Sequence, residues 1–222
     1  MVKKTALITG GTSGLGYGLV KQFLEKGWNV GTFGRRTEKI AELNEQFGGI
    51  NFFAMTCDLT VSNQIDNFLE EAYNKFQSVE VLILNGGKLG KTPLEPLKRL
   101  NLIDFRDVYE TNVFANVSLI KKVIGKQKTR KLKIVHVTSD AGVTPYSNWS
   151  PYGSSKAAMD MVIKILNEEE KENNLTSFSF DPGDMNTEMH RLALPEDLPE
   201  KLKNPQVSAR ELFDLIEKGE IA

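Results

Sequence analysis

Short runs of apolar and β-branched residues alternate along the chain with longer segments whose apolar residues recur at helical spacing. Residues 15–24 and 65–76 each carry such a helical stripe. Runs that are apolar throughout, such as VLIL at 81–84, are typical of strands covered on both faces. We expect strands at Thr5–Thr9, Asn29–Phe33, Asn51–Thr56, Val81–Leu84, Lys133–Thr138 and Ser177–Phe180. The alternation predicts an α/β fold, in which a doubly wound parallel sheet carries helices on both faces.

The composition is that of a folded globular protein and excludes several classes of function. Of the 222 residues, 40% are hydrophobic and 26% charged, and the length suits one domain, residues 1–222. With 28 basic and 29 acidic residues, no surplus of charge favours a nucleic acid or an anionic membrane as a partner. No run approaches the ~20 apolar residues of a membrane helix, and the N-terminus lacks the apolar core of a signal peptide, so we expect a cytoplasmic protein.

Cysteine and histidine are too scarce for the sites that they commonly build. Cys57 is the only cysteine, which excludes an internal disulfide and a thiolate zinc cluster. His136 and His190 are the only histidines, so little remains for a metal site or a Ser-His-Asp triad, and we expect no metal. His136 lies inside an apolar run and is expected to be a packed side chain, and Cys57 a small buried one.

A glycine-rich turn, Thr9–Gly16, follows the first expected strand and opens the first expected helix. Glycines allow a tight turn and let a pyrophosphate approach the helix N-terminus, where free N–H groups and the helix dipole favour anions. A plain strand–helix turn is the alternative, but the position at the first strand–helix junction of a βαβ series favours cofactor binding. The candidate residues are Gly10, Thr12, Ser13, Gly14, Leu15 and Gly16.

The second expected strand is followed by Arg35 and Arg36 and by no acidic residue. In dinucleotide-binding folds, an acid at this place binds the adenosine 2′-hydroxyl, whereas an arginine accommodates a 2′-phosphate. The two arginines could simply be solvated residues at a helix start. Because a guanidinium suits a phosphate well, we expect NADP(H) rather than NAD(H) as the cofactor.

Three residues suggest acid–base chemistry without histidine. Ser139 follows the expected strand 133–138 and therefore faces the edge of the sheet where ligands bind. Tyr152 and Lys156 are four residues apart, on one face of a helix. A lysine cation within ~4–6 Å could lower the tyrosine pKa by about 1–3 units and make it a general acid. A Tyr-Lys pair at this spacing is often only a surface pair, and its value here depends on Ser139 and the glycine-rich turn.

Taken together, these motifs resemble those of the short-chain dehydrogenase/reductase family, with a single Rossmann domain. The family's TGxxxGxG matches 9–16, its YxxxK matches 152–156 and its PGxxxT matches 182–187. The sequence departs from the family in two places. It has LNGG at 84–87 where the family has NNAG, and we expect it to lack the family's last strand. Further residues placed by the resemblance are Asp58, Leu59, Asn85, Gly86 and Gly87 near the cofactor, Asn112 near the catalytic groups, and Pro182, Gly183, Met185 and Thr187 near the nicotinamide.

The resemblance implies NADPH-dependent reduction of a small ketone or aldehyde to an alcohol, or the reverse reaction. Tyr152 would donate the proton and Ser139 would hold the carbonyl oxygen. Lys156 would bind the nicotinamide ribose and lower the tyrosine pKa, and Asn112 would support a water path that returns the proton. Thr187 and the backbone after 182 would hold the carboxamide. The alternatives are a non-catalytic NADP(H)-binding redox sensor, which needs no catalytic set, and a dehydratase or epimerase on the same scaffold.

The remaining expectations concern the substrate pocket and assembly. Asp140 is either a loop cap or a substrate contact, and Met185, Met189 and His190 are candidate pocket residues. The helix after 151 is apolar nearly all round, as is the segment 113–120, so both must be buried on more than one side. Because family members often pair these helices, we expect a homodimer of about 50 kDa, two chains of 24.8 kDa each.

Overall fold

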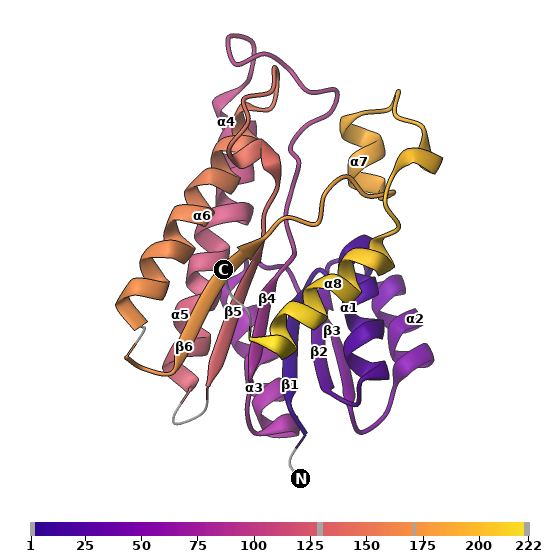
Figure 1. The fold of residues 1–222 in the computed structure, drawn as a ribbon, viewed down its shortest axis with the longest axis vertical. Helices are drawn as coiled ribbons and strands as arrows, with labels where there is room; N and C mark the ends of the chain where they lie inside the picture. Colours follow the sequence, from indigo (N-terminus) through magenta and orange to yellow (C-terminus); the bar gives the residue numbers. More distant parts are fainter. Residues whose placement is uncertain (1–2, 128–130, 171, 220–222) are drawn as a thin grey trace.

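The computed structural model describes residues 3–127, 131–170 and 172–219; the two ends of the expected domain therefore lie outside the described residues. Six strands form one parallel sheet in the order β3-β2-β1-β4-β5-β6. Their carboxyl ends point to the top of Figure 1. The strands are β1 (Thr5–Thr9), β2 (Asn29–Gly34), β3 (Phe52–Thr56), β4 (Val81–Leu84), β5 (Leu132–Val137) and β6 (Leu175–Phe180).

The expected strands are all present, and the fold class is confirmed. β1 and β4 have the predicted bounds; β2, β3 and β6 differ by one or two residues at one end, and β5 differs by one residue at each end. In the described part of the chain β6 forms one edge of the sheet, and no seventh strand follows it, as expected.

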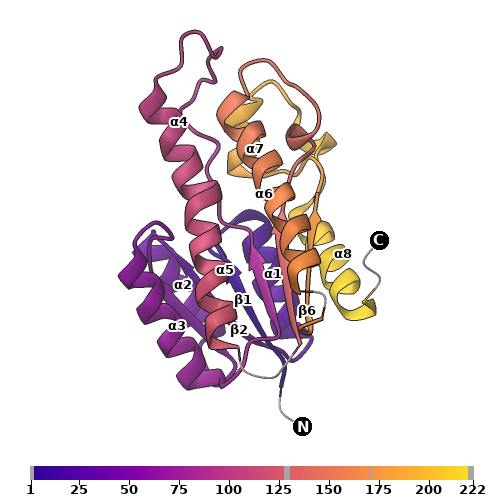
Figure 2. The ribbon, with the colours of Figure 1, turned by 90° about the vertical axis from the view of Figure 1, so that its left-hand side faces the viewer.

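Helices cover both faces of the sheet, as Figures 1 and 2 show. Side chains of β1 alternate between two hydrophobic cores: Ala6 and Ile8 belong to one and Leu7 to the other. The first core lies under α1 (Gly14–Glu25), α2 (Thr37–Phe47) and α8 (Pro205–Lys218). The second lies under α3 (Ser62–Phe76), α5 (Ala115–Lys126) and α6 (Ser150–Glu170).

The helices form where apolar spacing and end signals agree. The predicted stripe of α3, from Ile65 to Phe76, is buried, and its members from Ile65 to Ala72 belong to the second core. At the start of α8, the side chain of Asn204 accepts a hydrogen bond from the backbone N–H of Gln206. The same helix ends at Gly219, whose φ of 70° is the left-handed conformation that glycine adopts readily.

The segments at the carboxyl ends of the strands are shorter and less regular. They comprise α4 (Leu102–Tyr109), the π-helical turn η1 (Glu110–Phe114) that leads into α5, α7 (Glu188–Ala193), and the 3-10 turns η2 (Asp140–Gly142) and η3 (Pro199–Lys201). π-Helical turns are rare and frequently occur at functional sites. Within the described residues, no helix has the length and apolar character needed to cross a membrane.

Candidate active site

A cleft of about 1220 Å³ opens at the carboxyl ends of the strands. Ligands in open α/β sheets bind at this edge, and the volume exceeds that of a typical small-ligand pocket, as a dinucleotide plus substrate requires. All but two of the predicted site residues line the cleft. Those that line it are Gly10, Thr12, Ser13, Gly14, Leu15, Arg35, Arg36, Asp58, Leu59, Asn85, Gly86, Gly87, Ser139, Tyr152, Lys156, Pro182, Gly183, Met185 and Thr187.

The two exceptions, Gly16 and Asn112, lie behind the lining of the cleft. A Cβ on Gly16 would lie 2.1 Å from the carbonyl oxygen of Gly10 and 2.6 Å from Nδ2 of Asn85. Gly16 therefore lets α1 pack against its own preceding turn, and it does not face the cofactor space. Asn85 completes this packing, because its Nδ2 donates to the carbonyl oxygens of Thr9 and Gly10.

The N-terminus of α1 is suited to an anion. Gly10 and Gly14 have φ values of 70° and 53°, which explains glycine at both positions of the turn. Ser13 begins the helix, but its side chain makes no capping hydrogen bond, and the first turn holds no acidic residue. The first N–H groups of the helix therefore lack a side-chain partner beside a cleft that Ser13, Gly14 and Leu15 line. This arrangement fits the pyrophosphate of a dinucleotide.

Positive charge gathers where β2 ends. Arg35 is exposed, and Arg36 lies 3.5 Å from a carboxylate oxygen of Glu188 on α7, on the other side of the cleft. Burial alone would raise the pKa of Asp58. The hydrogen bonds from Thr60 and the charge of Arg35 together outweigh burial and hold the pKa of Asp58 below its usual range. The site thus offers two guanidinium groups and an ionised carboxylate to the adenosine half of a nucleotide.

Ser139, Tyr152 and Lys156 converge at the other end of the cleft. Ser139 caps η2: its Oγ accepts from the N–H of Ala141 at 3.2 Å and donates to Oδ1 of Asp140 at 3.1 Å. Nζ of Lys156 donates to the carbonyl oxygen of Val137 at 2.7 Å and lies 5.5 Å from the centre of the Tyr152 ring. Tyr152 is 9% exposed and Lys156 6%, so both side chains are largely buried although they line the cleft.

This burial reverses the expected direction of the tyrosine pKa. Burial raises the pKa of Tyr152 to about 12; its hydrogen bond with Ser139 lowers it only in part, and the charge of Asp181 raises it further. Burial also lowers the pKa of Lys156 to about 8, against the attraction of Asp160 and Asp181. The expected net lowering of the tyrosine pKa is therefore wrong for the protein's own groups. Tyr152 is a phenol at neutral pH, which is the form that donates a proton.

Asn112 positions its neighbours and does not face the cleft. It is buried in η1, and its Oδ1 accepts from the N–H of Lys88 at 2.7 Å. Its Nδ2 donates to the carbonyl oxygen of Lys88 and to Oγ of Ser155, the residue before Lys156. The side chain thus ties the loop after β4 to the helix that carries Tyr152. The water path expected at this residue stays a prediction.

An apolar and aromatic wall flanks the catalytic groups. The Trp149 ring lies 5.7 Å from that of Tyr152 and 6.0 Å from that of Tyr146. The Tyr146 hydroxyl donates to Asp140 at 2.5 Å, so Asp140 braces this wall from beside Ser139. Other side chains that line the cleft are Leu89, Met189, Leu192, Ala193 and Leu194.

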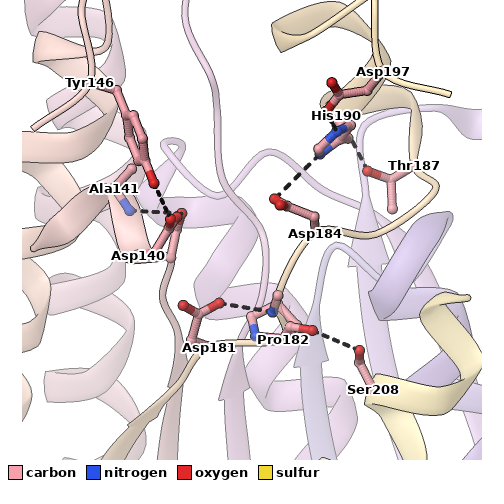
Figure 3. Close-up of polar contacts among 12 residues, drawn as sticks. Asp140, Ala141, Tyr146, Asp181, Pro182, Asp184, Thr187, His190, Asp197 and Ser208 are labelled. Atoms are coloured by element: carbon pink, nitrogen blue, oxygen red, sulfur yellow. Dashed lines mark hydrogen bonds and ion pairs between the residues drawn. The ribbon is translucent and has the colours of Figure 1, made fainter. Parts of the chain in front are cut away.

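Figure 3 places a second polar group across the cleft from Asp140 and Tyr146. His190 lies between two carboxylates, with Nε2 2.8 Å from Asp197 and Nδ1 3.7 Å from Asp184. Met185, Met189 and His190 all line the cleft, as expected of pocket residues. Asp140, for which the sequence left a loop cap or a substrate contact open, accepts from the Tyr146 hydroxyl and also lines the cleft.

Cys57 and His136, which we expected to be buried packing residues, are both buried. Cys57 is buried, and burial raises the pKa of its thiol to about 12, so it is no thiolate nucleophile. His136 is buried in β5, and burial, together with the charge of Lys156, lowers its pKa to about 2. His136 is therefore neutral and no proton carrier.

Comparison with known proteins decides the family. Residues 4–197 match the sequence model of the short chain dehydrogenases. The chain belongs to the short-chain dehydrogenase family. It is an oxidoreductase of that family, whose enzymes act on small carbonyl or alcohol substrates with a nicotinamide cofactor.

Several relatives of this short-chain dehydrogenase, and several solved structures of other proteins that resemble it, are informative. A probable NADP-dependent dehydrogenase of Haemophilus influenzae is 33% identical over 71% of this chain, a span that covers 62% of that relative. A benzil reductase ((S)-benzoin forming) of Bacillus subtilis is 29% identical over 96% of this chain and 93% of that protein. The crystal structure of the KRED1-Pglu enzyme superposes with a TM-score of 0.80 and 27% identity, covering 99% of this chain and 89% of that one. A 3-ketoacyl-(acyl-carrier-protein) reductase from Brucella melitensis, 23% identical, shares the fold with a TM-score of 0.88 over 100% of this chain and 95% of that one.

In this short-chain dehydrogenase, sequence reasoning missed the residues that form the pocket wall. Leu89, Tyr146 and Trp149 come from irregular segments, which carry no periodic signal. The nearest available signal was a pair of aromatic residues placed between Ser139 and Tyr152 in the sequence.

Proposed function

We propose that this protein is an NADPH-dependent reductase of small ketones or aldehydes, which also catalyses the reverse oxidation. One observation carries the proposal. A protonated, buried Tyr152 lies beside Lys156 and Ser139 in the same cleft that holds the uncapped helix N-terminus and two arginines. A redox sensor would need only the nucleotide-binding half of this cleft.

The nucleotide-binding half favours NADP(H). Arg35 and Arg36 line the cleft and would bind a 2′-phosphate, and the first turn of α1 would bind the pyrophosphate. Pro182, Gly183, Met185, Thr187 and Lys156 line the same cleft and would hold the nicotinamide and its ribose. The bound cofactor supplies the hydride for the carbonyl carbon. The probable NADP-dependent dehydrogenase of Haemophilus influenzae supports this preference as a relative.

The catalytic groups act on the carbonyl oxygen. Ser139 turns its hydroxyl hydrogen from Asp140 to that oxygen and holds it, while Tyr152 gives up its phenolic proton to form the alcohol. The resulting phenolate is stabilised by the Lys156 ammonium, whose charge is little screened because the site is buried. A water path past Asn112 and Lys156 then returns the proton to Tyr152.

The pocket wall favours a substrate with an apolar or aromatic group beside the carbonyl. Trp149 and Tyr146 offer ring faces and edges next to Tyr152, and Leu89, Met189 and Leu192 supply aliphatic surface. The benzil reductases of Bacillus subtilis and Saccharomyces cerevisiae among the relatives support the same class of compound.

The experiment follows NADPH absorbance with a panel of diketones, aldehydes, quinones and pteridines. We expect turnover of at least one aryl diketone such as benzil, and slower turnover with NADH. Binding of NADPH without turnover of any compound, or turnover that Tyr152→Phe leaves unchanged, would contradict the proposal. The first of these results is what a redox sensor would give.

We also propose that the protein is a homodimer through α5 and α6. Phe114, at the end of η1 where α5 begins, and Met161 and Ile165 of α6 are 58%, 56% and 50% exposed. Large apolar side chains grouped in this way are usually covered by a partner surface. Light scattering at low micromolar concentration should give about 50 kDa for the parent and for Lys164→Glu, but about 25 kDa for Ile165→Glu. A parent mass near 25 kDa would contradict the dimer. The cytoplasmic location expected from the sequence stays a prediction.

A further inference from the structure

The helix that carries the catalytic pair holds a third polar residue on the same face. Tyr152, Lys156 and Asp160 follow each other at intervals of four residues along α6. The Asp160 side chain is only 16% exposed. A carboxylate at such a depth is costly unless it is hydrogen-bonded and near a positive charge. Neither cofactor binding nor proton donation by Tyr152, as described above, requires a buried carboxylate at Asp160.

Asp160 is hydrogen-bonded to two strands at once. Its Oδ2 accepts from the hydroxyl of Thr138 at 2.7 Å, and its Oδ1 accepts from the hydroxyl of Ser179 at 2.6 Å. Thr138 is directly followed by Ser139. Ser179 lies one residue before the end of β6, which leads into the segment 182–187 proposed above for the nicotinamide. The carboxylate therefore fixes α6, which carries Tyr152, against the ends of β5 and β6, which lead to Ser139 and to the segment 182–187.

The surroundings of Asp160 leave it little freedom to move. A Cβ on Gly142 would lie 3.2 Å from Oδ2 of Asp160 and 3.3 Å from Cβ of Lys156. The glycine thus lets η2, which Ser139 caps, close onto this part of the helix. Movement of the carboxylate would disturb η2 and α6 together.

Asp160 is also the main opposing charge for the buried lysine. Among the described residues, the charges that act on Lys156 come from Asp160 on its own helix and Asp181 after β6, and both oppose the effect of burial. From β5, His136 approaches Oδ1 of Asp160 to 3.9 Å, but it is neutral. From η1, the facing group is the uncharged side chain of Asn112.

We propose that Asp160 is a positioning residue of the catalytic centre, which supplies the buried negative charge that stabilises the Lys156 ammonium and holds Tyr152 in register with Ser139. The inference rests on the proposed reductase function. It gives Asp160 two separable effects, one through its charge and one through its hydrogen bonds.

Three variants separate the two effects. Asp160→Asn keeps the shape of the side chain and removes its charge, whereas Thr138→Val and Ser179→Ala each remove one hydrogen bond and keep the charge. Lys156 must be charged to stabilise the phenolate, so the rate of reduction falls as pH rises through the Lys156 pKa. Without the Asp160 charge that pKa falls. We therefore expect the alkaline limb of kcat in Asp160→Asn to lie about 1 pH unit below that of the parent. In Thr138→Val and Ser179→Ala, kcat should fall several-fold at every pH and the limb should stay in place.

A direct titration of Lys156 makes the test independent of turnover. NMR of the isotope-labelled lysine side chains follows Lys156 against pH, and the Lys156→Arg variant assigns its signal. We expect a lower titration midpoint in Asp160→Asn and an unchanged one in Ser179→Ala. Equal midpoints in the parent and Asp160→Asn would overturn the proposal. A shifted midpoint in a protein that reduces no carbonyl would keep the effect of Asp160 on Lys156 and refute the reductase function instead.

If Asp160→Asn does not fold, Asp160→Glu replaces it. That variant keeps the charge and displaces the carboxylate by one methylene group, so kcat should fall while the alkaline limb and the Lys156 midpoint stay near those of the parent. A limb that moves down by about 1 unit in Asp160→Glu would contradict the assignment of the shift to charge.

Discussion

Replacing Tyr152 with phenylalanine removes one oxygen atom from the centre of the site. The ring keeps its contacts with Leu89, Ala141 and Trp149, so folding and NADPH affinity should change little. With the Tyr152 pKa at about 12, essentially every molecule at pH 7 carries the proton that the reaction uses. The variant should therefore lose the whole contribution of a general acid, about 10²–10⁴-fold in kcat.

The assay compares kcat and NADPH affinity in Tyr152→Phe and in a matched control, Tyr73→Phe. Tyr73 lies on α3, away from the cleft lining, and loses the same atom. We expect parental kcat in the control, and parental NADPH affinity in both variants by fluorescence titration. A Tyr152→Phe variant that keeps more than about a tenth of the parental kcat would refute Tyr152 as the proton donor. Loss of NADPH binding along with turnover would show that the hydroxyl serves the cofactor site first.

Three further predictions concern the cofactor site and the fold. Arg35→Ala should weaken NADPH binding by about 1.5–3 kcal/mol and leave NADH binding nearly unchanged, which calorimetry can measure; equal losses would make Arg35 structural. Gly16→Ala places a methyl group 2.1 Å from the Gly10 oxygen and should lower the free energy of unfolding, measured by chemical denaturation, by about 1–3 kcal/mol. The control Gly125→Ala meets nothing within 4 Å and should not lower that free energy. Tyr73→Phe removes a buried hydroxyl that has no hydrogen-bond partner in the described structure, so its Tm should rise by about 2–4 °C; a fall in Tm would mean that the hydroxyl is satisfied.

The fold was predictable because burial on two faces leaves a plain record in the sequence. The run at 81–84 is apolar throughout, and the run at 133–138 places Ile134, Val135 and Val137 in the two cores; such runs fit strands sandwiched between helices. The site was predictable for a topological reason. Residues as distant as Ser13 and Thr187 follow or lead elements whose ends meet at one edge of a parallel sheet, so motif order alone brings them together.

What the sequence could not reveal is how deeply each group is buried and which neighbours it meets. Spacing places Lys156 beside Tyr152, but only packing shows that Tyr152 is buried and that burial raises its pKa. The glycine-rich motif led us to assign Gly16 to the cofactor site, but in the structure it leaves room for the carbonyl oxygen of Gly10. Asp160 interrupts an apolar helix in the sequence, and nothing there shows that it accepts hydrogen bonds from two strands.

Transfer of label from the cofactor to the product tests the central claim most directly. The protein is incubated with benzil and NADPH deuterated at its transferable position, and the alcohol is analysed by mass spectrometry. We predict one deuterium on the new carbinol carbon of the product in the parent, and almost no product in Tyr152→Phe over the same time. Product without deuterium, or NADPH consumption without an alcohol product, would contradict hydride transfer to a carbonyl in this cleft.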